Sequence, residues 1–316
     1  MRVGLIVDSA CDLPHEFFRK HDLFVLPVTA IIDGHTYLDT RDPVRTQEFY
    51  ESGLLGKGHQ AETEAFSTRQ IYDLFMEEIV TQYDVAICET VTRSRSQVFD
   101  HASEAMNMVM ANYQHARSAA GREGKFSMRV IDSKQIFAGQ GLLAAHTLRL
   151  IDQQLSKNAL RHQVEVFTDR IYTCVIPRDL HYIRERARRR GDNNVSAVAA
   201  FLGKVLNINP VIFGQGVEGK PVAKTRDFHA AVEKVMNYAI GRVEAGLLTP
   251  YVSLSCGLSW AEIDALPGLD QLRETCKKHG VELLLSQMGI TSSIYVGPGS
   301  LCLALAAGPH EFADFQ

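Results

Sequence analysis

The chain has 316 residues, and a typical domain size of ~150 residues predicts two domains. Its 33 Lys and Arg against 37 Asp and Glu give a formal net charge of −4, which argues against a wholly basic nucleic-acid-binding protein. Apolar residues make up 46% of the sequence and charged residues 22%. A chain of this composition buries enough surface to fold, so disorder is not expected to be its main state.

The apolar stretches of the sequence are short. No run of about 18 apolar residues occurs, so no transmembrane helix is expected. The first stretch, Val3–Val7, is too short for the core of a signal peptide, and Asp8 ends it. We therefore expect a cytoplasmic protein that begins with a buried strand.

The six cysteines are scattered without a Cys-x-x-Cys pair, and the twelve histidines are equally dispersed. A disulfide scaffold or a zinc ribbon needs clustered spacings. We expect buried, reduced cysteines, no metal and no organic cofactor.

Short β-rich runs alternate with longer helical patterns along the chain. Strands are predicted over Val3–Val7, Leu23–Val28, Val85–Cys88, Met128–Ile131, Tyr172–Ile176, Asn209–Phe213, Val252–Ser255 and Val281–Leu285. Helices are predicted over Pro14–His21, Thr68–Val80, Ser96–Ser118, Gly141–Leu155, Val195–Leu206, Asp227–Ala245 and Trp260–His279. This alternation predicts an α/β fold with mainly parallel sheets covered by helices. The polar segment Ser156–Arg161 places a boundary near 160–165, so we expect α/β domains over 1–162 and 163–316.

Two glycine-rich segments could bind phosphate or another anion. Gly214–Gly219 matches Gly-x-Gly-x-x-Gly, but Lys220-Pro221-Val222 reads as a second strand where a dinucleotide site needs a helix. A hairpin turn is therefore predicted there. Gly139-Gln140-Gly141 does open a helix, where it could bind an anion or allow close strand–helix packing, and we favour packing.

A hydroxyl-rich segment, Thr90–Ser96, follows one predicted strand and precedes a long helix. Such a loop at a helix N-terminus can bind a carboxylate or a phosphate. Capping of the helix by Ser94 or Ser96 would explain only one of these hydroxyls, and both interpretations stay open.

The segment Arg184–Arg190 holds five arginines. It is interpreted as a solvated helix face, or as a docking patch for an acidic partner or for phosphate groups.

Several motifs, in order along nearly the whole chain, resemble those of the DegV family. They are Asp8–Pro14, Val25–Thr29, Asp33-Gly34, Tyr37, Asp39, Val130–Lys134, Gly139–Gly141, Leu202-Gly203, Leu206–Ile208, Pro210, Gly289 and Gly297–Gly299. Each motif is weak alone, and their order makes the resemblance specific.

The resemblance implies a two-domain α/β protein with a ligand site between the domains. Family members enclose a long-chain fatty acid in a tunnel, and some present its carboxylate to a fatty-acid kinase. The implied ligand is a long-chain fatty acid, with the carboxylate site in 1–162 and the acyl chain enclosed by 163–316. Transient membrane contact would accompany such a role.

The family's carboxylate-binding Thr corresponds to Thr63, because Ser67, Ile71 and Phe75 then fall on family positions. The family's second donor, a Ser, falls on Ser96. Thr92 and Ser94 are the substitutes if the alignment shifts.

Three departures from the family pattern concern the surface that would face a kinase. A family His is Tyr295 here, whose phenol can still donate a hydrogen bond to a carboxylate. The Gly-Gly-Arg-Ile segment is absent, and Arg188, Arg189 or Arg190 could replace its Arg. A family His-Ala-Asp stretch is Ser255-Cys256-Gly257.

We therefore expect a lipid-binding protein without catalytic residues. The alternative is an enzyme or regulatory protein acting on a different carboxylate or phosphate. Ser96 with His101 is the local candidate for a nucleophile–base pair, although five residues along a helix is poor geometry.

Overall fold

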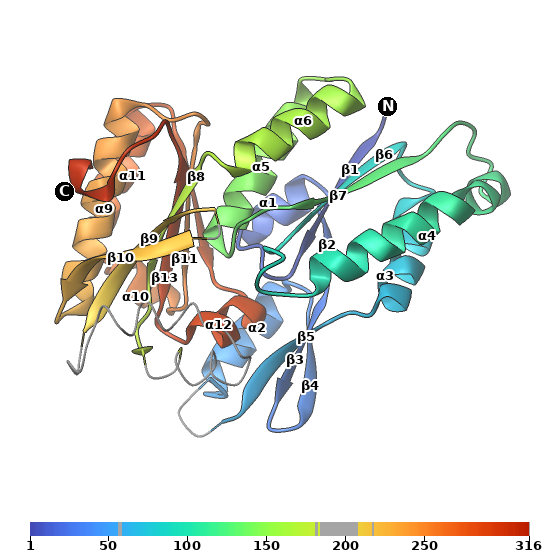
Figure 1. Cartoon of the computed structure of the whole chain (residues 1–316). Coiled ribbons are helices and arrows are strands. Elements are labelled where there is room, and N and C mark those ends of the chain that lie inside the picture. The colour runs from blue at the N-terminus through green and yellow to red at the C-terminus, as the bar shows by residue number, and fades with distance from the viewer. Residues whose placement is uncertain (56–58, 181–182, 184–207, 217, 316) are drawn as a thin grey trace.

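The computed structural model describes residues 1–55, 59–180, 183, 208–216 and 218–315. Three sheets form the frame of the molecule (Figure 1). The predicted helix Val195–Leu206 and the arginines Arg188, Arg189 and Arg190 lie outside the described residues.

The first sheet is parallel throughout, as predicted for this half of the chain. Its order is β2 (Phe24–Leu26), β1 (Val3–Asp8), β6 (Val85–Thr90) and β7 (Ser127–Asp132). One face carries α3 (Thr68–Leu74), the π-helix η1 (Phe75–Ile79) and α4 (Val98–Ala119), which enclose an apolar cluster. The other face meets α1 (His15–Lys20), α5 (Ala138–Asp152) and α6 (Lys157–Thr168).

A small antiparallel sheet was missed by the sequence prediction. It has the order β4 (His35–Asp39), β3 (Val28–Ile32) and β5 (Ala61–Ala65), and α2 (Pro43–Glu51) packs beside it. The predicted strand Leu23–Val28 is in fact divided at Pro27, which has no N–H to donate to a ladder. After it, the amide of Val28 donates to the Ser9 hydroxyl instead, at 2.9 Å.

The third sheet has the order β10 (Glu218–Thr225), β9 (Asn209–Gln215), β8 (Ile171–Ile176), β13 (Leu301–Ala306), β11 (Tyr251–Cys256) and β12 (Glu282–Gln287). Only β11 and β12 run parallel, so the prediction of mainly parallel sheets is wrong for this one. Strand β9 runs antiparallel to both β8 and β10, and the other antiparallel pairings come from β13, which the sequence prediction missed. It inserts between β8 and β11 and runs antiparallel to both. The predicted glycine hairpin joins β9 and β10.

Helices α9 (Phe228–Ala245), α10 (Trp260–Asp264) and α11 (Leu269–Lys278) accompany the third sheet, followed by α12 (Ile290–Val296) and the 3-10 turn η2 (Phe312–Phe315). The predicted helix Trp260–His279 is broken at Gly268, which adopts a left-handed conformation with φ of 79°. No helix in the described ranges is long and apolar enough to cross a membrane. All six cysteines are buried and unpaired, as predicted.

Helix α5 joins the first and third sheets, because it contacts β1 and β6 as well as β8, β11 and β13 (Figure 1). Gly139-Gln140-Gly141 lies in its first turn. A Cβ on Gly141 would overlap the backbone oxygen of Asp12, and one on Gly139 would lie 2.9 Å from Thr173 Cγ2. The packing interpretation of these glycines is therefore confirmed.

Candidate ligand site

Two consecutive residues at the carboxyl end of β1 hold the parts of the site together. Asp8 accepts hydrogen bonds from the amides of Val91, at 2.5 Å, and Ala10, at 2.9 Å. The Ser9 hydroxyl accepts from the Val28 amide and donates to the Asp39 carbonyl at 2.5 Å. Asp8 thus fixes the loop after β6, and Ser9 fixes the start of β3.

The hydroxyl-rich loop follows β6 at the same end of the sheet. Thr92 is 2% exposed, its amide donates to the Gln135 carbonyl, and its hydroxyl lies 3.3 Å from that of Ser94. Helix α4 begins at Val98 with Gln97 as its N-cap and has no side-chain cap. The Ser96 hydroxyl accepts from the Val98 amide, the first of α4, at 3.4 Å, so Ser96 contributes to the start of the helix although Gln97 is its N-cap residue.

Thr63 lies in the middle of β5, half-buried and opposite Ala30 of β3. Antiparallel partners share a face, so Thr63 lies on the face that packs against Ile290 and Ile294 of α12. Its hydroxyl makes no hydrogen bond to another described residue, which leaves it available to a ligand.

A contact with α4 links the end of β5 to the hydroxyl-rich loop. His101 Nδ1 donates to the Phe66 carbonyl at 2.8 Å, directly after β5. Its ring is therefore oriented toward Phe66, whereas the Ser96 hydroxyl receives the Val98 amide. The structure does not pair Ser96 with His101, so the geometry of the nucleophile–base alternative is not formed.

Ser67 and Tyr295 take different positions from the other candidates. Ser67 is the N-cap of α3 and forms a capping box with Gln70, to which its hydroxyl donates at 2.8 Å. Tyr295 is half-buried on α12, with its ring edge-to-face on Phe137 at 5.8 Å between centroids. Phe137 lies two residues after Gln135, whose carbonyl accepts the Thr92 amide, so Tyr295 packs on the segment to which the hydroxyl-rich loop is bound.

A buried carboxyl group lies behind the loop and was missed by sequence reasoning. Glu89 is fully buried in β6, its Oε1 accepts the Thr147 hydroxyl, and its backbone carbonyl accepts the Gln140 side-chain amide at 3.2 Å. Burial raises the pKa of Glu89 to about 8, and it raises the pKa of Asp8 to about 6. A glutamate inside a continuous apolar strand was the available signal.

Replacing Glu89 with Gln should flatten the pH dependence of stability between about pH 4.5 and 8. A carboxyl group whose pKa is raised in the fold stabilises it when protonated, so the contribution is complete below pH 4.5 and is lost as the pH rises through about 8. Gln keeps the oxygen that accepts from Thr147. Urea unfolding at several pH values measures the effect, and Glu233→Gln on the exposed side of α9 is the matched control. An unchanged slope in Glu89→Gln would contradict the assignment.

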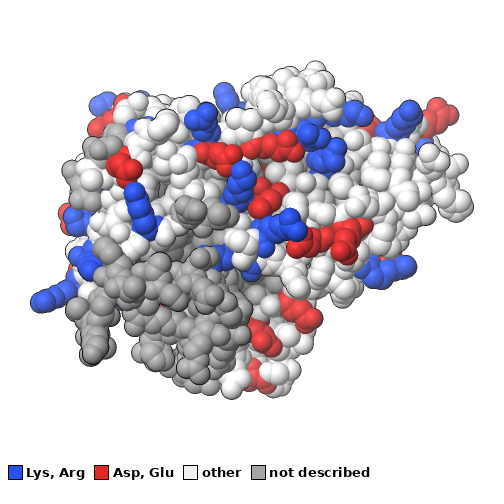
Figure 2. Space-filling model, viewed as in Figure 1, with Lys and Arg blue, Asp and Glu red and all other residues white. Residues whose placement is uncertain are grey.

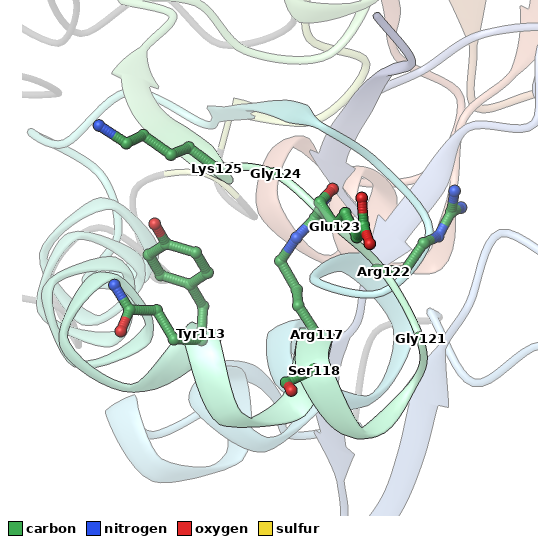
Figure 3. A pocket seen from close by; sticks show the side chains of 9 residues that line it. Tyr113, Arg117, Ser118, Gly121, Arg122, Glu123, Gly124 and Lys125 are labelled. Carbon is green, nitrogen blue, oxygen red and sulfur yellow. The ribbon is translucent and has the colours of Figure 1, made fainter.

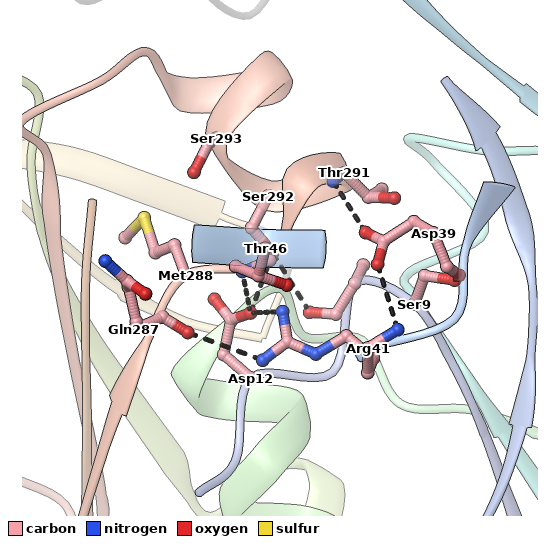
Figure 4. Close-up of polar contacts among 12 residues, drawn as sticks. Ser9, Asp12, Asp39, Arg41, Thr46, Gln287, Met288, Thr291, Ser292 and Ser293 are labelled. Atoms are coloured by element: carbon pink, nitrogen blue, oxygen red, sulfur yellow. Dashed lines mark hydrogen bonds and ion pairs between the residues drawn. The ribbon is translucent and has the colours of Figure 1, made fainter. Parts of the chain in front are cut away.

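A second polar group joins distant parts of the chain (Figure 4). Asp12 and Arg41 form a buried ion pair at 3.0 Å, and Arg41 also donates to the Gln287 carbonyl at 3.4 Å. Asp12 accepts from the Gly289 amide at 3.0 Å, and Asp39 accepts from the Thr291 amide at 2.8 Å. We call this group, with Ser292, Ser293 and Tyr50, the seam network.

A surface pocket of about 470 Å³ at the end of α4 lies elsewhere (Figure 3). The two arginines that line it already have partners. Arg117 donates to the carbonyls of Val80 and Tyr83, and Arg122 donates to those of Thr81 and Gln82. These arginines bind the chain around the end of the π-helix, so the pocket is not the candidate site. Lys and Arg are interspersed with Asp and Glu over the described part of the face in Figure 2.

Comparison with known proteins places this chain in a family. Residues 2–308 match the family described as "Uncharacterised protein, DegV family". A DegV domain-containing protein of Xanthomonas axonopodis pv. citri is 41% identical over 313 residues, which cover 99% of this chain and 100% of that protein. A protein named fatty acid-binding protein from Thermotoga maritima is 23% identical over 308 residues, covering 95% and 96% of the two chains.

Solved structures share the fold. A stearic acid-binding protein from Eubacterium ventriosum superposes with a TM-score of 0.78 at 21% identity and covers 96% of this chain and 98% of its own. DegV of Bacillus subtilis, described as a fatty acid binding protein, has a TM-score of 0.74 at 18% identity, with 97% and 100% covered. The predicted α/β fold of the family is therefore confirmed.

Proposed function

Because the chain belongs to the DegV family, we propose that it is a lipid-binding protein that holds the carboxylate of a long-chain fatty acid with Thr63 and the hydroxyl-rich loop. The observation that carries the proposal is the arrangement around Asp8 and Ser9. These two residues hold the hydroxyl-rich loop and β3 at one end of the first sheet, and β3 in turn carries β5 with Thr63. The names of the Thermotoga, Eubacterium and Bacillus relatives support the choice of ligand.

The energetics suit such a ligand. Each buried methylene contributes about 0.8 kcal/mol, so a long acyl chain supplies roughly 10 kcal/mol before the costs of association. A few donors at the carboxylate end then suffice for orientation. We propose Thr63, Thr92, Ser94 and Ser96 as these donors, with Tyr295 beside them. Ser67 is the least favoured of the sequence candidates, since its hydroxyl donates to Gln70.

The division into a carboxylate-binding domain over 1–162 and an acyl-enclosing domain over 163–316 stays part of the proposal. Presentation of the bound acid to a partner kinase, with docking through Arg188, Arg189 and Arg190, is a further part. A charge-reversed triple variant that bound fatty acid and still captured every partner would count against that docking.

Mass spectrometry of the organic extract from freshly purified, denatured protein tests the proposal. A stoichiometric C14–C18 fatty acid is the expected result. A protein that holds another small molecule, and that shows no saturable fatty-acid binding after delipidation, would overturn the proposed ligand.

The variant Thr63→Val should weaken fatty-acid binding by about 10- to 100-fold, because one hydrogen bond to a charged group contributes ~1.5–3 kcal/mol. Val keeps the shape and the strand preference of Thr. The measurement is displacement of a fluorescent fatty acid from delipidated protein. Thr36→Val is the matched control, because Thr36 is exposed on β4 and pairs with Ile31 on the opposite face of the same sheet. Equal affinity of the two variants would remove Thr63 from the site.

A further inference from the structure

Helix α12 begins without a cap of its own. Its N-cap is Gly289, which has no side chain to accept a hydrogen bond, and none of its own residues caps it. The first amides of a helix need acceptors from elsewhere. Here Asp12 accepts from Gly289 and Asp39 accepts from Thr291, so carboxylates from the first 40 residues of the chain cap a helix near its end.

The Tyr50 hydroxyl completes this attachment from α2. It donates to the Met288 carbonyl at 3.2 Å and hydrogen-bonds to the Ser293 hydroxyl. Ser292 hydrogen-bonds to Asp12 at 3.1 Å. Hydrogen bonds from three N-terminal segments thus surround the start of α12. Figure 4 shows those that involve Asp12 and Asp39.

The position of α12 bears directly on the proposed carboxylate site. Ile290 and Ile294 pack with Ala30 and Ala61, on the sheet face that carries Thr63. One residue further, Tyr295 contacts Phe137 beside the hydroxyl-rich loop. A shift of α12 therefore changes the space in front of Thr63 and the place of Tyr295 together.

We propose that Tyr50, together with Asp12 and Asp39, is a positioning residue that places α12 against β5 and thereby determines how well the site discriminates a carboxylate from an uncharged head group. The inference rests on the proposed function. Asp12, Asp39 and Gly289 lie far apart in the sequence, and one network of hydrogen bonds joins them at the start of α12. A Cβ on Gly289 would overlap the Arg41 guanidinium, so a larger residue there would displace Arg41 from the network.

The test compares hexadecanoic acid with hexadecan-1-ol, which has the same chain without the carboxylate. Both are measured by displacement of a fluorescent fatty acid from the delipidated full-length protein. Tyr50→Phe should weaken acid binding by about tenfold, as expected for residues coupled through a shift of the backbone between them, and alcohol binding by less than twofold. Tyr83→Phe is the matched control, since its hydroxyl contacts the exposed Asp22 at 3.2 Å, and it should change neither affinity.

A double-mutant cycle separates positioning from general stability. If Tyr50 acts through the Thr63 site, Tyr50→Phe should not change the acid-to-alcohol ratio further in a Thr63→Val background. Equal weakening of acid and alcohol, or the same change of ratio in both backgrounds, would overturn the inference. Ser293→Ala removes the same hydrogen bond from the α12 side and serves if Tyr50→Phe does not fold. Absence of saturable acid binding by the unmodified protein would overturn the proposed function, and this inference with it.

Discussion

Replacing Arg41 with Met should lower the free energy of unfolding by about 3–5 kcal/mol, because it leaves the Asp12 carboxylate buried without its cation. Asp12 is fully buried, and the Arg41 side chain is 6% exposed. Hydrogen bonds from Gly289 and Ser292 remain to Asp12, but these neutral donors do not replace a guanidinium. Burial already raises the pKa of Asp12, so its charge depends on Arg41. Urea unfolding at neutral pH measures the loss.

The control is a solvent-exposed ion pair between the same residue types in this protein. Arg273 contacts Asp264 at 2.9 Å and Asp270 at 3.0 Å on the surface, and Arg273→Met should cost less than about 1 kcal/mol. Asp12→Asn combined with Arg41→Met should be less destabilised than the sum of the single changes, since the pair is removed together. Additive losses would show that the two side chains act independently.

The parallel sheet could be predicted because its strands are continuous apolar runs separated by helical patterns. The small antiparallel sheet could not be predicted. Its β5 reads Ala-Glu-Thr-Glu-Ala, which has neither the β-branched content nor the hydrophobicity of a strand, and it forms because β3 offers a ladder and α12 covers one face. Strand β13 is apolar throughout, but its antiparallel insertion depends on which neighbours it meets, which local sequence does not encode.

Only part of the candidate site could likewise be predicted from the sequence. Local pattern indicated the hydroxyl-rich loop, and the family resemblance indicated Thr63. The roles of Asp8 and Ser9 depend on the amides that they meet, 83 and 19 residues away in the sequence. The contact between Arg41 and Gln287 spans 246 residues, so no local pattern reveals it. Ser67 matched a family position, but its Gln70 partner three residues later is also the pattern of a capping box.

Substituting Ala for Gly141 should lower the free energy of unfolding by about 2 kcal/mol or more, whereas helix propensity alone would predict an increase. In a helix interior, Gly→Ala favours folding by ~0.8–1 kcal/mol. Here the added Cβ would overlap the backbone oxygen of Asp12 and approach Leu13 Cγ at 3.1 Å. Overpacking of this kind costs typically ~1–3 kcal/mol and occasionally more.

Two restraints prevent the Asp12 segment from moving away to relieve that overlap. The Asp12 amide donates to the Phe137 carbonyl at 3.3 Å, and the Asp12 side chain lies in the seam network, so the segment cannot retreat without disturbing the start of α12. Thermal or urea unfolding measures the change in stability. Gly308→Ala, where a Cβ meets no atom within 4 Å, should stay within about 0.5 kcal/mol of the unmodified protein. A stabilised Gly141→Ala variant would mean that α5 does not need this close approach, and the packing role of its glycines would fall.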